Sequence, residues 1–128
     1  MNPLESRLHD WPAHWPRAVV VHGAAEVDRA CAPGLPVVLL SASGAALFAG
    51  VGFWRALMEQ ARARHGDLIV ADVLDCADAP GLALAALRLG QRALVLDPAC
   101  PGYAAVVAIA TRVNAKLLIT RDRTESVR

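Results

Sequence analysis

Residues 67–89 read DLIVADVLDCADAPGLALAALRL. From Leu68 to Leu74 the only polar residue is Asp72. A strand with one solvated face alternates apolar and polar residues, whereas a nearly continuous apolar run indicates a strand covered on both faces, as in a parallel sheet between layers of helices. An acidic loop follows, and Pro80 then fits the first turn of a helix, where its missing N–H costs nothing. The segment therefore predicts one strand–helix unit of an α/β fold.

The same alternation extends in both directions along the chain. Apolar segments predict strands at 19–22, 37–40, 68–74, 93–96 and 116–120, and helices are predicted at 25–32, 53–65, 82–89 and 102–113. Strands that alternate with helices favour parallel βαβ units with right-handed crossovers. We expect a single three-layer, doubly wound α/β domain of the Rossmann-like or flavodoxin-like kind, with five parallel strands flanked by four helices. The first strand is expected to be central, with order 3-2-1-4-5 or 2-1-3-4-5, and the sequence does not decide between these orders.

The chain divides into three parts. Residues 1–16 form an N-terminal arm, residues 17–121 the α/β domain, and residues 122–128 a polar C-terminal tail. Prolines at 12 and 16 discourage a long helix in the arm. Trp11 and Trp15 are large apolar side chains in that arm, and they either pack on the domain's own surface or clasp a neighbouring subunit.

Composition limits the partners of the 128-residue chain. Its formal net charge is +1 and no face is visibly rich in Lys or Arg, so neither nucleic acid nor a membrane surface is expected as a partner. No apolar run reaches the roughly 18 residues of a membrane span. The N-terminus has no apolar core of the signal-peptide type, and the three cysteines show no CxxC spacing. We therefore expect a cytoplasmic protein with reduced thiols.

Two predicted helices lack a polar face. Apolar residues make up 55% of the chain, against about 45–50% in typical domains. The helices at 82–89 and 102–113 contribute to this excess, and a helix that is apolar all round is normally buried all round. We expect a homodimer with both helices in the interface. The alternative is that exposed alanines are tolerated because they expose little apolar area.

The segment Ser41–Gly52, SASGAALFAGVG, is rich in glycine and precedes a predicted helix. Main-chain N–H groups at a helix N-terminus favour anions. We predict a small anionic ligand at the carboxyl edge of the sheet, bound by Ser41, Ser43, Gly44, Gly50, Gly52 and Asp97. The alternative is a long flexible connection. Val51 stands where a P-loop has lysine and Arg55 where a dinucleotide motif has its third glycine, so no organic cofactor is expected.

Acidic residues at the end of the central strand are the second candidate site. Carboxylates there can hold Mg²⁺ or act as a general base, but the spacing matches no recognised metal motif and no metal site is expected. Asp75 and Asp78 are also explained as loop and capping residues. Asp72 lies in an apolar strand and needs a partner, for which His22, Arg121 or a main-chain N–H are the candidates.

A nucleophilic cysteine is the third candidate. Cys76 follows the central strand, and His22 is the histidine predicted at the same sheet edge, so the two form a possible nucleophile and base. The usual alternative is a small buried side chain. The catalytic candidates are thus Asp72, Asp75, Cys76 and His22.

No motif is specific enough to name a family, and a doubly wound fold hosts many activities. Three functions remain open. The first is a small homo-oligomeric domain that binds a small anionic ligand. The second is a cofactor-independent or metal-assisted hydrolase or lyase that uses the loop from Asp72 to Asp78. The third is an assembly module without a ligand.

Overall fold

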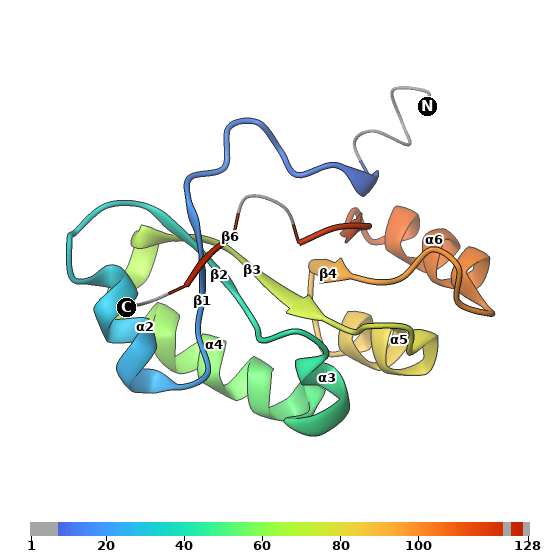
Figure 1. The fold of residues 1–128 in the computed structure, drawn as a ribbon, viewed down its shortest axis with the longest axis horizontal. Coiled ribbons are helices and arrows are strands. Elements are labelled where there is room, and N and C mark those ends of the chain that lie inside the picture. Colours follow the sequence, from blue (N-terminus) through green and yellow to red (C-terminus); the bar gives the residue numbers. More distant parts are fainter. Residues whose placement is uncertain (1–7, 122–123, 127–128) are drawn as a thin grey trace.

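A computed structural model describes residues 8–121 and the backbone of residues 124–126, which form an α/β structure (Figure 1). The strands are β1 (Ala18–Val20), β2 (Val37–Leu40), β3 (Ile69–Asp75), β4 (Ala93–Val95), β5 (Lys116–Leu118) and β6 (Thr124–Ser126). The helices are α2 (Ala24–Cys31), α3 (Ala45–Phe48), α4 (Val51–His65), α5 (Pro80–Arg88) and α6 (Tyr103–Arg112), with a short 3₁₀ turn, η1 (Gly66–Leu68), before β3. Every strand pair in this described part is parallel.

The predicted α/β class is confirmed, with parallel strands that alternate with helices in one compact, Rossmann-like domain. Both predicted strand orders are wrong. The order is β5-β4-β3-β2-β1-β6, so each of the first five strands lies beside its predecessor and β1 is not central. The sixth strand, β6, comes from the segment expected to be a polar tail and pairs with β1. The parts of that tail at 122–123 and 127–128, and residues 1–7 of the arm, lie outside the described residues.

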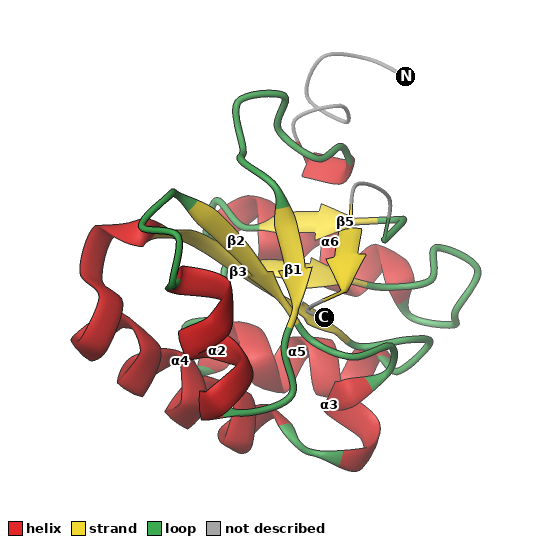
Figure 2. Cartoon of the chain, turned by 60° about the vertical axis from the view of Figure 1, so that its left-hand side comes forward, coloured by secondary structure: helices red, strands yellow, loops and turns green. Residues whose placement is uncertain are grey.

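The sequential order explains where the helices lie. Right-handed crossovers that always step in the same direction place their helices on the same face of the sheet. The buried side chains of α2 to α6 all belong to one core with that face. Figure 2 shows α2, α3, α4 and α5 below the sheet and α6 behind β5. The two-sided helical cover expected of a doubly wound sheet is therefore not found among the described residues.

The opposite face of the sheet is covered by the N-terminal arm. Trp11 and Trp15 pack against a second, smaller core formed by strand residues. Trp11 Nε1 donates a hydrogen bond of 2.8 Å to the main-chain oxygen of Thr120, and its ring meets that of Trp15 edge to face at 5.8 Å. Of the two interpretations of these tryptophans, packing on the domain's own surface is confirmed.

The strand β3 joins two halves of the sheet. It pairs with β2 from Ile69 to Val73, and with β4 only at Leu74 and Asp75. The register with β2 shifts between Ile69 and Ala71, so Val70 is an extra residue and remains 43% exposed. The amino half of β3 is thus free of β4 pairing.

Helices α5 and α6, which were expected to form a dimer interface, each bury one face against the rest of the domain and leave the other face partly or fully exposed. In α6 the buried residues are Val106 and Ala110, and the exposed positions include Ala104, Ala105 and Ala108. Alanines expose little apolar area, so the pattern fits a tolerated outer surface as well as an interface. Self-association remains a prediction. No helix in the described chain has the length and apolar character needed to cross a membrane.

Candidate functional site

The carboxyl ends of β3, β4 and β5 open into a depression of about 500 Å³. We call it the carboxyl-edge depression; its lining residues are Ser43, Asp75, Ala77, Asp78, Val95, Asp97, Pro98, Ile119, Thr120 and Arg121. Parallel strands bring their carboxyl ends to one edge, which is where open α/β sheets bind ligands. The structure therefore brings three of the predicted site residues together here, namely Ser43, Asp75 and Asp97.

A buried ion pair forms one wall of this depression. Arg121 Nη1 lies 2.7 Å from Asp75 Oδ2, and only 4% of the Asp75 side chain is exposed. Arg121 Nη2 also donates to the main-chain oxygen of Ser41 at 3.0 Å. The Asp75 main-chain N–H donates to Ser41 Oγ at 2.9 Å. These bonds tie the ends of β2 and β3 to the residue that leaves the sheet after β5, so the wall is preorganised.

Ala77, at the bottom of the acidic loop, has a strained backbone. Its φ is +51°, in the left-handed region that side chains with a Cβ avoid. The conformation is held by two hydrogen bonds of 2.8 Å: the Ala77 N–H donates to Asp75 Oδ1, and its carbonyl accepts the Asp97 N–H. Strain of this kind persists where surrounding structure imposes it, often at binding sites.

Replacing Ala77 by glycine tests this strain. We expect Ala77→Gly to raise the free energy of unfolding by up to about 1 kcal/mol, because glycine adopts positive φ without the steric cost. Urea denaturation gives the measurement. The control is Ala108→Gly on exposed helix α6, which should lose about 1 kcal/mol. Destabilisation of both variants by equal amounts would show that Ala77 is not strained.

The depression has a negative balance of charge. Asp78 and Asp97 are exposed carboxylates, whereas the Arg121 guanidinium pairs with Asp75. The neighbouring thiol of Cys100 responds to this environment: burial, and then the Asp97 and Asp78 carboxylates, raise its pKa. A ligand placed here meets more negative than positive groups.

Asp72 does not belong to this edge. It lies in the first half of β3 with its side chain toward α4, and all three partners suggested by the sequence are wrong. Arg62 Nη1 donates to Asp72 Oδ1 at 2.6 Å, while Trp54 Nε1 and Gln91 Nε2 donate to Oδ2 at 2.9 and 2.8 Å. Arg55 Nη1 adds a longer contact of 3.4 Å. Asp72 is thus the centre of a buried polar network that holds α4 on the sheet.

Sequence reasoning missed these partners, although one signal was present. Arg55 and Arg62 are seven residues apart, which is two helical turns, so they lie on the same side of α4 beside its apolar stripe. The two arginines could have been recognised as partners for Asp72, because it is the single charged residue in the apolar segment 68–74 that follows this helix.

Removal of the Asp72 carboxylate should destabilise the fold strongly. We expect Asp72→Ala to lower the free energy of unfolding by about 2–4 kcal/mol, because it leaves the buried indole N–H of Trp54 without an acceptor and the partly exposed Arg55 and Arg62 without their counter-charge. Chemical denaturation of the wild type and variant gives the value. Asp67→Ala, an exposed aspartate in η1, is the matched control and should stay within about 0.5 kcal/mol of wild type. A small effect at Asp72 would contradict its place at the centre of the network.

The predicted pair of Cys76 and His22 is not brought together. Cys76 is fully buried in the helix-side core, and burial, together with the Asp75 carboxylate, raises the pKa of its thiol to about 12. His22 follows β1, two strands away from β3, and its Nδ1 lies 2.8 Å from Glu26 Oε1. Its side chain is largely exposed. These surroundings oppose thiolate formation and favour the interpretation of Cys76 as a core residue.

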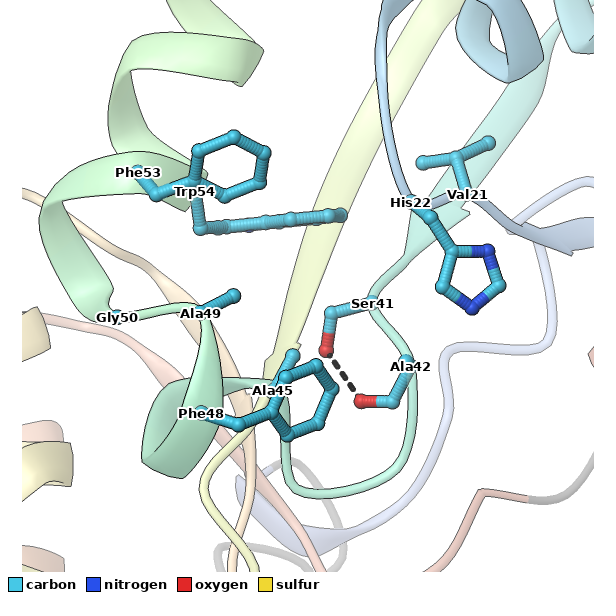
Figure 3. A pocket seen from close by; sticks show the side chains of 10 residues that line it. All are labelled: Val21, His22, Ser41, Ala42, Ala45, Phe48, Ala49, Gly50, Phe53 and Trp54. Carbon is cyan, nitrogen blue, oxygen red and sulfur yellow. Dashed lines mark hydrogen bonds between the residues drawn. The ribbon is translucent and has the colours of Figure 1, made fainter.

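The glycine-rich segment builds a small apolar pocket. Its middle forms the four-residue helix α3, where Gly44 (φ +68°) precedes the helix and Gly50 (φ +96°) turns the chain into α4. This cavity has a volume of about 60 Å³. Figure 3 shows Phe53 and Trp54 on one side of it, His22 across from them, and Phe48 beside Ser41. Gly52 is exposed within the first turn of α4. Aromatic walls of this kind suit an apolar group better than an anion.

The described residues contain no evident metal site. Across the described ranges, 8–121 and 124–126, no group of three or more His, Cys, Asp or Glu side chains is arranged to hold a metal ion. Comparison with known protein families, with curated proteins and with solved structures finds no match for the chain. The chemistry of the site therefore has to be inferred from its own residues.

Proposed function

We propose that this protein binds a small polar molecule in the carboxyl-edge depression. The observation that supports this most directly is the convergence of strand ends around an open space of about 500 Å³, within the range of roughly 300–1,000 Å³ typical of small-ligand sites. The Asp75–Arg121 ion pair and the strained Ala77 fix one side of that space before any ligand arrives. Preorganisation lowers the entropic cost of binding.

The charges favour a ligand that donates hydrogen bonds. Asp78 and Asp97 present carboxylate oxygens, which accept hydrogen bonds and attract cations. An ammonium group or a set of hydroxyl groups is the complementary chemistry. The small anion expected from the glycine-rich segment is the rival class, and it would have to compete with the Asp75 carboxylate for Arg121.

We favour binding over the hydrolase or lyase alternative because the candidate catalytic side chains are already engaged by other residues or buried. Asp75 is committed to Arg121, and Asp72 is enclosed by its own network. Burial raises the pKa of the Cys76 thiol to about 12 and so opposes a nucleophilic role. Catalysis by these residues would need a general base or nucleophile within reach of a substrate.

Thermal-shift measurements with small amines, polyols, carboxylates and phosphates test this proposal. We expect amines or polyols to raise the melting temperature, because a ligand that binds only the folded state stabilises it. Asp97→Asn and Asp78→Asn should weaken the shift. Asp67→Asn, at the opposite edge of the sheet, is the matched control. A shift that survives both carboxylate changes, or one produced by anions alone through Arg121, would overturn the proposed ligand class.

We also infer self-association through α5 and α6. The support is the exposed Leu89 at the end of α5 beside the alanine-rich surface of α6. Light scattering after size exclusion at micromolar concentration should give twice the chain mass of 13.5 kDa. Ala108→Glu should convert the dimer to a monomer, because it places a charge in the apolar contact. Ala25→Glu changes an alanine that is also exposed but lies on α2, and this variant should remain a dimer. A monomeric wild type would contradict the inferred self-association.

The cysteines support a reducing location such as the cytoplasm. Cys31, Cys76 and Cys100 are all free and all buried. Free thiols are usual where glutathione and thioredoxin keep cysteines reduced, and small secreted domains more often pair them.

A further inference from the structure

The sheet opens at its amino edge, between β3 and β4. These strands pair at Leu74–Leu94 and Asp75–Val95, but the first half of β3 pairs with β2 alone. The first residues of β3 therefore have no strand partner on the side of β4, which leaves a gap in the sheet there. An open depression of about 340 Å³ lies at this gap, which we call the amino-edge crevice.

The side chain of Gln91 does not itself line the crevice, but it holds together two lining residues, Asp72 and Ala93, which we call the floor of the crevice. It is fully buried, and its Nε2 donates to the main-chain oxygens of Asp72 and Ala93 at 3.1 and 2.9 Å. The same nitrogen lies 2.8 Å from Asp72 Oδ2. The amide thus bridges β3 to the start of β4 where the main-chain ladder is missing. A buried, fully bonded floor of this kind is rigid.

Three arginines line the crevice above this floor. Arg55 Nη1 donates to Gln91 Oε1 at 2.6 Å, and Arg62 Nη1 to Asp72 Oδ1 at 2.6 Å. Arg92 Nη1 donates to the main-chain oxygens of Leu87 and Gln91 at 3.1 and 3.0 Å. Each guanidinium is therefore held through one terminal nitrogen. Arginine carries five N–H donors, and among the described residues the Nε and Nη2 groups of these three have no hydrogen-bond partner, so they can bind a ligand.

The charge at this edge is opposite to that of the carboxyl-edge depression. Three arginines and one buried carboxylate, Asp72, line the crevice, and only Arg55 and Arg62 contact that carboxylate, so the crevice has an excess of positive charge. Trp15 and Val70 add apolar surface to its wall. Arginine forks match the geometry of phosphate oxygens and bind them through paired hydrogen bonds.

We propose that the amino-edge crevice is a second binding site, for the phosphate group of a small phosphorylated molecule. Arg55, Arg62 and Arg92 hold the phosphate oxygens, and Trp15 contacts the organic part. The site is separate from the carboxyl-edge depression and does not depend on the function proposed for it.

Titration calorimetry of the full chain with inorganic pyrophosphate, at fixed ionic strength, tests the site. One pyrophosphate per chain is expected. Arg92→Gln should weaken binding about tenfold or more, since it removes a charge-assisted contact. This variant keeps the fold because Arg92 bonds only to main-chain oxygens in the described structure. Arg92→Lys should recover part of the affinity. Arg112→Gln, an exposed arginine at the end of α6, is the matched control and should bind as wild type.

Nuclear magnetic resonance locates the bound anion. Pyrophosphate should shift the indole N–H signal of Trp54, which donates to Asp72 Oδ2, and that of Trp15. Asp97→Asn, at the carboxyl edge, should leave pyrophosphate affinity unchanged, so failure of one site is distinguishable from failure of the other. Absence of binding by the folded wild type, equal weakening by Arg112→Gln, or signals that shift only at the carboxyl edge would each overturn the proposal.

Discussion

The buried carboxylate of Asp72 is the constraint on which the arrangement of the domain depends. A charge enclosed between a helix and a sheet is costly unless opposite charge and hydrogen bonds surround it. Arg62, Trp54 and Gln91 meet that need from two separate parts of the chain. Their bonds fix the position of α4 over β3 and the distance from β3 to the start of β4. Apolar packing alone is not directional and would leave helix α4 freer to slide.

This constraint also shapes the two edges of the sheet. Gln91 takes the place of ladder hydrogen bonds between Asp72 in β3 and the start of β4, so main-chain pairing of these strands is confined to the carboxyl end of β3. Because the strands follow one another in order, all crossovers step in one direction and the helices share a face. The other face is left to the arm, and the two open edges receive side chains of opposite charge.

Most features of the structure that depend on neighbouring residues in the sequence were predicted correctly, whereas most features that depend on contacts between distant residues were not. The strands β2 and β3 followed from local runs of apolar residues, and Asp75 and Asp97 were placed at one edge because parallel strands end together. Strand order could not be predicted, because the handedness of a crossover does not say on which side the next strand adds. The apolar run of β3 correctly indicated two covered faces, but one cover is Trp11 and Trp15 rather than helices.

The chemistry of the predicted anion site also depended on contacts that the sequence does not show. A glycine-rich segment before a helix suggested an anion site, yet that segment folds into α3 and an apolar pocket, and the carboxylates collect at the same edge. Positive charge collects at the other edge, on arginines that look like ordinary surface residues in the sequence. There Asp72 orients two guanidinium groups, those of Arg55 and Arg62, and the third, that of Arg92, bonds to main-chain oxygens and keeps its charge unpaired by Asp72. A structural ion network that is left with excess positive charge is also a preorganised receptor for an anion.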